Sequence, residues 1–298
     1  MDKRARVHVA GAHTLIGAAI VRELQRQGYQ QVSGLDDETI ERIAPEYVFV
    51  ASGKSGGIGA NQRQPATLML DNLLAATQTI AAAHRCSVKK LLYLASSCCY
   101  PKNSPQPMRV ESLLTGPLEP TSEAYALAKI AGLKLCQAYR QEHGAPFISG
   151  IVADVFGSAE ALDLDDLHVV PALLWRMHTA KQQGAPEVQI WGSGKPRREF
   201  VYADDAANAC IFAMQHYNEA DPINLGGGSE MSIRDLAESV REVVGFKGEL
   251  QFDTGKPDGM PFKALDSSKL LAMGWRAQTP FKSALALTYR QMLQKIAG

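Results

Sequence analysis

The sequence predicts an α/β fold, because short apolar segments alternate with segments that have the apolar spacing of helices. Two further observations support this prediction: a glycine-containing turn follows the first apolar segment, and the regular alternation ends near residue 157. Strands that alternate with helices form a parallel sheet covered by helices on both faces. We therefore expect a Rossmann-type, doubly wound parallel sheet with a smaller C-terminal substrate-binding region.

The alternating elements place several polar or glycine residues at the carboxyl ends of strands, where such sheets bind ligands. Gly11, Gly53, Ser96 and Asp154 all fall at these ends, so we expect one site to collect them. The expected strands span residues 6–10, 31–35, 47–51, 90–95 and 147–155. The expected helices span residues 15–27, 66–84 and 123–143.

The turn at residues 11–17, between the first strand and the first helix, is suited to a dinucleotide. Free backbone N–H groups and the helix dipole at such a turn attract a pyrophosphate. The usual fingerprint has three glycines, and Thr14 stands where the middle one is expected, so an ordinary strand-to-helix turn is the alternative. The residues expected to contact the cofactor here are Gly11, His13, Thr14, Leu15, Ile16 and Gly17.

Asp36 follows the second expected strand, about twenty residues beyond the glycine turn. A carboxylate at this place can accept hydrogen bonds from both ribose hydroxyls of NAD(H), and it repels the 2′-phosphate of NADP(H). A solvated loop acid is an equal alternative. As a cofactor contact, Asp36 favours NAD(H).

The chain is expected to divide into two regions. Residues 1–157, together with about 196–224, would form the dinucleotide-binding domain, since they carry the regular alternation. Residues from about 158 to 195 and from 225 to 298 would form the substrate-binding region, because short helices and Pro/Gly pairs dominate there. The segment from Glu199 to Asp205 is expected to return the chain to the main sheet.

Composition excludes several classes of function. The 298 residues contain 31 Lys+Arg and 31 Asp+Glu, which gives no electrostatic case for a nucleic acid or membrane partner. No segment resembles a signal peptide or a membrane span. Five scattered cysteines, two of them adjacent, do not form a metal-binding pattern and favour a reducing cytoplasmic location.

Tyr125 and Lys129 lie four residues apart in an expected helix, so they share one face, and Ser96 ends a nearby strand. A cation beside a phenol favours the phenolate, so we expect the pKa of Tyr125 to fall from about 10 toward neutrality. Such a phenol can exchange a proton with a carbonyl/alcohol pair, while Ser96 holds the same oxygen. The Tyr-x-x-x-Lys pattern also occurs by chance in many helices.

Further motifs make this pattern specific. They include Ser-Ser-Cys-Cys-Tyr-Pro-Lys at 96–102, Tyr-Ala-Leu-Ala-Lys at 125–129 and Lys-Pro-Asp-Gly at 256–259, with segments 118–121, 168–174 and 191–194. Together they resemble the GDP-L-fucose synthase family of extended short-chain dehydrogenases/reductases, and the resemblance covers most of the chain. It implies epimerisation of a GDP-4-keto sugar at C3 and C5, then reduction of C4 with NADP(H).

The resemblance implies a role for each of five catalytic residues. Tyr125 would donate a proton to the C4 oxygen, and Ser96 would hold that oxygen. Lys129 would lower the pKa of the phenol and bind the nicotinamide ribose. Cys98 and His168 would form the epimerisation pair, one removing a proton beside the ketone and one supplying it from the other face. From the residues alone, Cys98 is equally a small buried hydrophobe and His168 a loop or cap residue.

The resemblance also implies the contacts that hold the two ligands. Arg198 would pair with a diphosphate oxygen, and Trp191 would pack against the guanine or the sugar. For Trp191 the alternative is a core aromatic, and for Arg176 a solvated helix face. The expected substrate-binding residues are Arg176, Trp191, Arg198 and Asp258. The further expected cofactor contacts are Lys129, Val152, Asp154, Val155 and His168.

The chain departs from the family pattern mainly at the cofactor end. His13 and Thr14 stand where the family has arginine and glycine, Asp154 stands where it has asparagine, and the segment after the second strand is shorter. Because of these changes, NAD(H) remains an alternative to NADP(H) as the cofactor. They also leave two alternatives: an epimerase of another GDP-4-keto sugar, such as a heptose, with weak or no reduction, and a non-catalytic nucleotide-sensing regulatory subunit.

The partners expected from the resemblance are a GDP-sugar and a second copy of the chain. A homodimer would form through the helices at 66–84 and 123–143.

Overall fold

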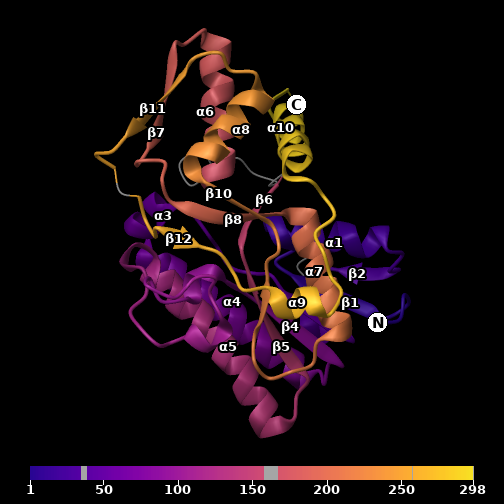
Figure 1. Cartoon of the computed structure of the whole chain (residues 1–298). Coiled ribbons are helices and arrows are strands. Elements are labelled where there is room, and N and C mark those ends of the chain that lie inside the picture. The colour runs from indigo at the N-terminus through magenta and orange to yellow at the C-terminus, as the bar shows by residue number, and fades with distance from the viewer. Residues whose placement is uncertain (35–38, 158–166, 257, 298) are drawn as a thin grey trace.

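The computed structural model describes residues 1–34, 39–157, 167–256 and 258–297, so Asp36 lies outside the described residues. A six-stranded sheet with the order β2-β1-β3-β4-β5-β9 forms the lower part of the molecule in Figure 1. All neighbouring strands in it are parallel, which confirms the expected sheet. The strands are β1 (Arg6–Ala10), β2 (Gln31–Ser33), β3 (Tyr47–Val50), β4 (Lys90–Ser96), β5 (Phe147–Val152) and β9 (Ile223–Leu225).

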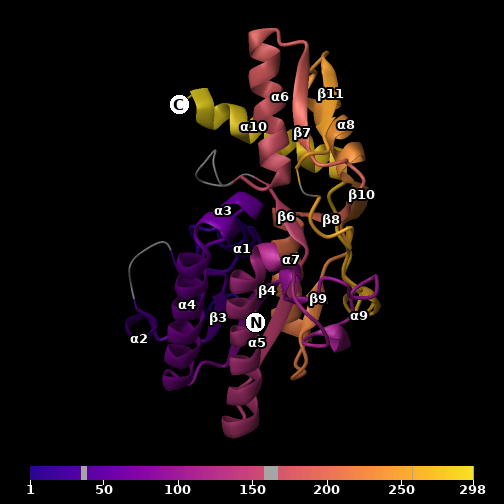
Figure 2. The same cartoon turned by 90° about the vertical axis from the view of Figure 1, so that its left-hand side faces the viewer.

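Helices cover both faces of this sheet, with α4 and α5 on one face and α1 and α7 on the other (Figures 1 and 2). The side chains of β4 show why. Leu91 and Tyr93 enter the core under α4 and α5, whereas Leu92 and Leu94 enter the core under α1 and α7. Successive side chains of a strand point to opposite faces, so an apolar strand needs a cover on each. The helices are α1 (Leu15–Arg26), α4 (Pro65–Arg85), α5 (Glu123–His143) and α7 (Ala203–His216).

Short helical segments connect these elements. They are α2 (Ile40–Ile43), α3 (Ile58–Arg63), α9 (Ser268–Ala272) and the 3-10 turns η1 (Ser97–Cys99), η2 (Val110–Ser112) and η3 (Pro120–Ser122). Within the described ranges, no helix has the length and apolar character needed to cross a membrane.

The remaining elements gather above the main sheet in Figure 1. Strand β8 pairs antiparallel with β10 and parallel with β12 and β6, while β7 and β11 form a separate parallel pair. A third core, which includes Met177, Ile190, Phe200 and Val240, lies among α6, α8, α10 and these strands. The elements are β6 (Asp154–Phe156), β7 (Glu187–Trp191), β8 (Arg197–Tyr202), β10 (Ser229–Ser232), β11 (Glu249–Asp253), β12 (Phe262–Lys263), α6 (Val169–Gln183), α8 (Ile233–Val244) and α10 (Phe281–Ala297).

Two expectations about the strands are wrong. The expected strand at 147–155 is two strands, because β5 ends at Val152 and Asp154 opens β6, which pairs with β8 instead of the main sheet. The segment from Glu199 to Asp205 does not return the chain to the main sheet; β9 does so at Ile223. A three-residue strand such as β9 is too short to show a period of two in the sequence. The expected division into two regions stays a prediction.

Glu199 links three segments of the sheet built on β8 by hydrogen bonds. Its side chain is 5% exposed. Oε1 accepts hydrogen bonds from the N–H groups of Gly227 at 2.6 Å and Gly228 at 3.1 Å, and Oε2 accepts one from Leu265 at 2.8 Å. Burial raises the pKa of this carboxyl, and the backbone donors act in the opposite direction. The carboxylate therefore joins β8 to the turn after β9 and to the segment after β12.

The Glu199→Gln substitution is expected to lower the free energy of unfolding by about 1–3 kcal/mol, because an amide N–H₂ would face a backbone donor. Urea unfolding at pH 7 measures this change. The matched control is Glu230→Gln on the facing strand β10, whose carboxylate pairs with Arg197 at 2.8 Å and is 40% exposed. The control is expected to cost about 0–1 kcal/mol. Equal losses in the two variants would contradict the fastening role of Glu199.

Candidate active site

The turn before α1 has the backbone that a pyrophosphate requires. Gly11 has a φ of 84°, and a Cβ on it would lie 2.5 Å from the Ser52 Cα. A Cβ on Gly17 would lie 2.0 Å from the Gly11 carbonyl oxygen, so both positions require glycine. Thr14 is the N-cap of α1, since its Oγ1 accepts a hydrogen bond from the Gly17 N–H at 3.1 Å. The residue that departs from the fingerprint thus caps the helix.

This turn fits a dinucleotide. The first turn of α1 carries no acidic residue, so no side chain there repels a phosphate from the positive helix end. His13 is exposed beside the turn, while Leu15 and Ile16 are partly buried in the first turn. Val152 and Val155, expected to line the same cofactor, are partly buried at the junction of β5 and β6.

Tyr125 and Lys129 share one face of α5 beside the end of β4. The Lys129 ammonium is buried, donates a hydrogen bond to the Ser52 carbonyl at 3.2 Å and lies 5.8 Å from the centre of the Tyr125 ring. Gly132 allows this close packing, because a Cβ on it would lie 2.3 Å from the Cζ of Tyr93 on β4. The approach of helix to strand therefore encloses the ammonium.

Burial decides the protonation of both groups. It raises the pKa of Tyr125 far above its usual value, Cys98 and Cys99 raise it further, and a hydrogen bond with Ser96 acts in the opposite direction. It lowers the pKa of Lys129 to about 8. The expectation that Lys129 lowers the pKa of Tyr125 from about 10 toward 7 is wrong, because desolvation of a phenolate outweighs the attraction of the nearby cation. The phenol is held neutral, which is the form that donates a proton.

Two polar residues near Lys129 were not expected from the sequence. Ser52 Oγ and Asn72 Oδ1 are buried and have no hydrogen-bond partner. Asn72 Nδ2 donates to the carbonyl oxygens of Lys54 at 2.8 Å and Leu68 at 2.7 Å, so its orientation is fixed. Such orphaned polar atoms fit a polar ligand beside the ammonium. No motif in the sequence marks either residue.

The end of β4 presents one of two adjacent thiols. Ser96 caps the turn η1, and its Oγ accepts a hydrogen bond from the Cys98 N–H at 3.3 Å. Cys98 is partly exposed, whereas Cys99 is buried and burial raises the pKa of its thiol to about 12. Cys98 is thus the thiol that can meet a ligand.

His168 is the N-cap residue of α6, and its Nε2 lies 3.4 Å from Ser55 Oγ. The side chain is exposed, yet the protein atoms around the imidazole desolvate it and lower its pKa, while Asp154 acts in the opposite direction. A neutral imidazole can accept a proton, as an epimerisation base must.

Charged side chains connect the phenol, the thiol and the imidazole. The Lys263 ammonium lies 2.5 Å from the Asp154 carboxylate. Cys98 interacts electrostatically with Tyr125 and Lys263, and Asp154 with His168. The structure therefore brings the three proposed acid/base groups around one charged cluster, to which Lys263 was not assigned from the sequence.

A second group of expected residues lies at the end of β7. Trp191 is 53% exposed, so it is not a core aromatic, and the cations of Arg176 and Lys256 each lie 5.4 Å from its ring centre. The Asp258 carboxylate accepts hydrogen bonds from the Ser193 N–H at 2.6 Å and from its hydroxyl at 2.8 Å.

Arg198 links this group to the acid/base cluster. The guanidinium is partly buried on β8, and it interacts electrostatically with Asp154, Cys98 and Asp258. An extended ligand that reaches from Trp191 to Cys98 would therefore pass Arg198.

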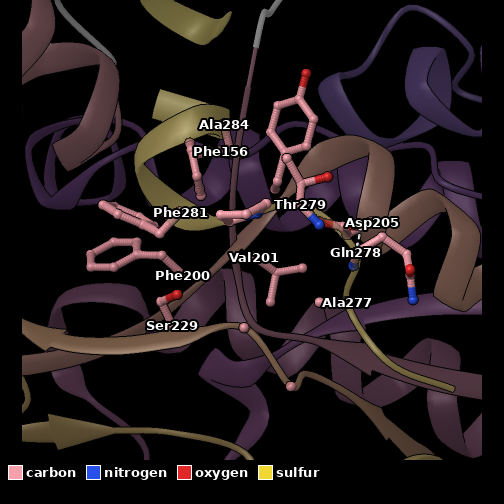
Figure 3. A pocket seen from close by; sticks show the side chains of 14 residues that line it. Phe156, Phe200, Val201, Asp205, Ser229, Ala277, Gln278, Thr279, Phe281 and Ala284 are labelled. Carbon is pink, nitrogen blue, oxygen red and sulfur yellow. Dashed lines mark hydrogen bonds between the residues drawn. The ribbon is translucent and has the colours of Figure 1, made fainter. Parts of the chain in front are cut away.

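A hollow of about 290 Å³ lies apart from both groups, between β8 and the start of α10 (Figure 3). Phe156, Phe200 and Phe281 line it, and the Asp205 carboxylate at its edge accepts hydrogen bonds from backbone N–H groups at 3.0 and 3.1 Å. None of the residues expected to bind cofactor or substrate lines this hollow, so it is not the candidate site.

Comparisons with known proteins identify the family of the chain. The model of the NAD dependent epimerase/dehydratase family matches residues 7–226. GDP-L-fucose synthase 1 of Arabidopsis thaliana is 45% identical over 309 residues, which cover 100% of this chain and 96% of that protein.

Two solved structures are similar over the whole chain. A GDP-6-OMe-4-keto-L-xylo-heptose reductase from C. jejuni has a TM-score of 0.90 and 28% identity, with 99% of each chain covered. A GDP-L-fucose synthetase from Naegleria fowleri bound to NADP has a TM-score of 0.89 and 26% identity, with 100% of this chain and 96% of that chain covered. The chain belongs to the NAD dependent epimerase/dehydratase family, in the branch of the GDP-L-fucose synthases.

Proposed function

We propose that the protein is a GDP-4-keto-6-deoxy-D-mannose 3,5-epimerase/4-reductase that makes GDP-L-fucose or a closely related GDP-deoxysugar. The observation that carries the proposal is the gathering of Tyr125, Cys98 and His168 around one charged cluster. The full-length similarity to a GDP-L-fucose synthase of Arabidopsis thaliana supports the choice of substrate.

Epimerisation requires a base and an acid on opposite faces of the sugar. A C–H bond beside a ketone becomes acidic when the enolate oxygen is stabilised, and the hydroxyls of Tyr125 and Ser96 would donate hydrogen bonds to that oxygen. Of Cys98 and His168, one would take the proton and the other would return one from the opposite face. This removal and return of a proton, at C3 and again at C5, leaves the C4 ketone intact.

Reduction requires a proton at the C4 oxygen. Tyr125 would supply it from the neutral phenol that burial maintains. When bound, the nicotinamide cofactor supplies the hydride to C4. Lys129, with its pKa of about 8, is mainly charged at neutral pH and would hold the nicotinamide ribose.

The substrate nucleotide would lie along the second group of residues. Trp191 and Arg176 would contact the guanine end, and Arg198 would pair with the diphosphate. Asp258 would act through Ser193, which it holds by two hydrogen bonds.

The two steps are expected to separate in variants. Tyr125→Phe should slow reduction by at least about 10²-fold, while exchange of the C3 and C5 protons with solvent continues in part. Cys98→Ser should slow exchange by a similar factor with little change in substrate binding. Proton NMR in heavy water follows exchange, and cofactor absorbance follows reduction.

The control for these variants is Cys86→Ser, a partly exposed thiol outside the site, which should retain both rates. Reduction at the wild-type rate in Tyr125→Phe would refute the role of the phenol. Exchange at the wild-type rate in Cys98→Ser would assign the base to another residue.

A second candidate is an epimerase of a GDP-4-keto heptose with weak or no reduction. The similarity to the heptose reductase from C. jejuni favours it. Incubation with each sugar separates the candidates, since deuterium at C3 and C5 of a heptose whose ketone is retained identifies the second. Binding of a nucleotide without turnover of either sugar would identify the third alternative, a nucleotide-sensing regulatory subunit.

The cofactor is proposed to be held by the turn at 11–17, Lys129 and the residues 152–155. NADP(H) is supported by the NADP-bound structure from Naegleria fowleri, and NAD(H) by Asp36. We expect Asp36 to decide between them, because its carboxylate repels a 2′-phosphate.

Fluorescence titration with NADH and NADPH is therefore expected to show tighter binding of NADH. The Asp36→Asn substitution should strengthen NADPH binding by at least about fivefold and change NADH binding little. The neighbouring Asp37→Asn substitution is the matched control and should leave the ratio unchanged. Tighter binding of NADPH than of NADH by the wild-type protein would contradict this role of Asp36.

A homodimer through α4 and α5 is also proposed. These helices lie side by side, and Leu70, Leu74 and Leu127 expose large apolar side chains on them. Leu70 and Leu74 are four residues apart and share one face, and contiguous exposed apolar surface is typical of an interface.

The double substitution Leu70→Glu/Leu74→Glu is expected to convert the dimer to a monomer in sedimentation velocity, because two carboxylates would enter an apolar contact. Leu114→Glu, an equally exposed leucine outside these helices, should leave the dimer intact. A wild-type protein that sediments as a monomer would contradict the proposed interface.

A further inference from the structure

The segment 51–57, which connects β3 to α3, contacts both halves of the candidate site. The Ser52 carbonyl accepts a hydrogen bond from the Lys129 ammonium at 3.2 Å. Three residues further along, Ser55 Oγ lies 3.4 Å from Nε2 of the His168 imidazole. One short loop therefore joins the residue proposed to hold the nicotinamide ribose to a residue proposed to move a sugar proton. Ser55 was not expected from the sequence.

Two buried asparagines hold the backbone of this loop on both sides of Ser55. Asn72 and Asn61 are 2% and 9% exposed. Nδ2 of Asn72 donates a hydrogen bond to the Lys54 carbonyl at 2.8 Å. Nδ2 of Asn61 donates one to the Gly56 carbonyl at 2.9 Å. A hydrogen bond enclosed by protein is electrostatically stronger than one in water, so the peptide groups that flank Ser55 have fixed positions.

The same loop packs closely against the residue before His168. A Cβ on Gly57 would lie 3.1 Å from the Leu167 carbonyl oxygen, a separation that few real side chains adopt. The backbone next to Ser55 and the backbone next to His168 therefore approach each other closely, which supports the contact between the hydroxyl and the imidazole.

The position of Ser55 distinguishes the two ring nitrogens of His168. The ring does not cap α6, although His168 is its N-cap residue. A neutral imidazole carries one N–H. With this hydrogen on Nε2, it is donated to Ser55 Oγ; with the hydrogen on Nδ1, the imidazole would find no protein acceptor among the described residues. The contact therefore favours the Nε2–H form, in which Nδ1 carries a free lone pair.

We propose that Ser55 is a positioning residue that binds the Nε2–H of His168, so that Nδ1 is the nitrogen that exchanges a proton with the sugar. The inference rests on the proposed function for its purpose. As a base, Nδ1 takes the proton from the carbon beside the ketone, and the electron pair of the C–H bond moves into the enolate at the C4 oxygen. As an acid, the imidazolium returns a proton to that carbon from Nδ1. Nε2 keeps its hydrogen in both forms, so the contact with Ser55 persists through the cycle.

The test is a long-range ¹H–¹⁵N NMR spectrum of the full chain with labelled histidine, since it distinguishes a protonated ring nitrogen from an unprotonated one. At pH 8 the His168 imidazole is neutral, because burial lowers its pKa. His168→Gln identifies its signals among those of the seven histidines. We expect a protonated Nε2 and an unprotonated Nδ1 in the wild type. In Ser55→Ala the two signals should move toward each other, because the Nδ1–H form gains population.

A protonated Nδ1 in the wild type would overturn the proposal, and so would an unchanged spectrum in Ser55→Ala. Ser55→Thr keeps the hydroxyl and should keep the wild-type spectrum. Signals of Ser55→Thr that move as far as those of Ser55→Ala would overturn the role of the hydroxyl. The matched control is Ser239→Ala on α8, which removes a hydroxyl that donates to the Asp235 carbonyl at 2.9 Å. An equally large change in this control would overturn the local assignment.

The NMR measurement needs neither sugar nor cofactor, so it is independent of the proposed function. The same variants are then compared in the exchange of the C3 and C5 protons. Ser55→Ala should slow the exchange step that His168 carries by about three- to tenfold with little change in KM, and Ser55→Thr should restore it. A changed spectrum with unchanged exchange would overturn the positioning role in catalysis. Absence of exchange in the wild type would overturn the proposed function, and the spectrum alone would then decide the contact.

Discussion

The close packing of α5 against the end of β4 is the constraint on which the candidate site depends. It encloses the Lys129 ammonium, whose hydrogen bond to the Ser52 carbonyl compensates part of the cost of removing it from water. The same enclosure keeps the Tyr125 phenol neutral. Burial, and not the neighbouring cation, thus sets the protonation of the phenol that we propose as the proton donor, and Gly132 makes the packing possible.

The small sheet on β8 brings charges from distant parts of the chain to this packed edge. Asp154 arrives from the strand that follows β5, and Lys263 from the strand that follows β11. Neither charge could be buried alone, because an unpaired ion in this environment costs several kcal/mol. Their pairing therefore links β6 to β12. Glu199 holds the same sheet together from within.

Much of the fold was predictable, because apolar periodicity is a local property: the strands around Leu92 and the helix carrying Tyr125 have the expected bounds to within a few residues. The motifs also identified Tyr125, Cys98 and His168, which interact with the same charged pair in the structure. The protonation of Tyr125 was not predictable, since a spacing of four residues says nothing about burial. The partner of Asp154 was not predictable either, because no local pattern connects it with Lys263. Thr14 departs from the glycine fingerprint in the sequence, and its role as a cap becomes visible only from its hydrogen bond with the Gly17 N–H.

The central claim is that one sugar ring meets the phenol, the thiol and the imidazole together. The most direct measurement is a crystal structure of the Tyr125→Phe variant with GDP-4-keto-6-deoxymannose. The account predicts the C4 oxygen beside Ser96 and residue 125, with Cys98 and His168 on opposite faces of the ring. A hexose that contacts only one of Cys98, His168 and residue 125 would contradict it.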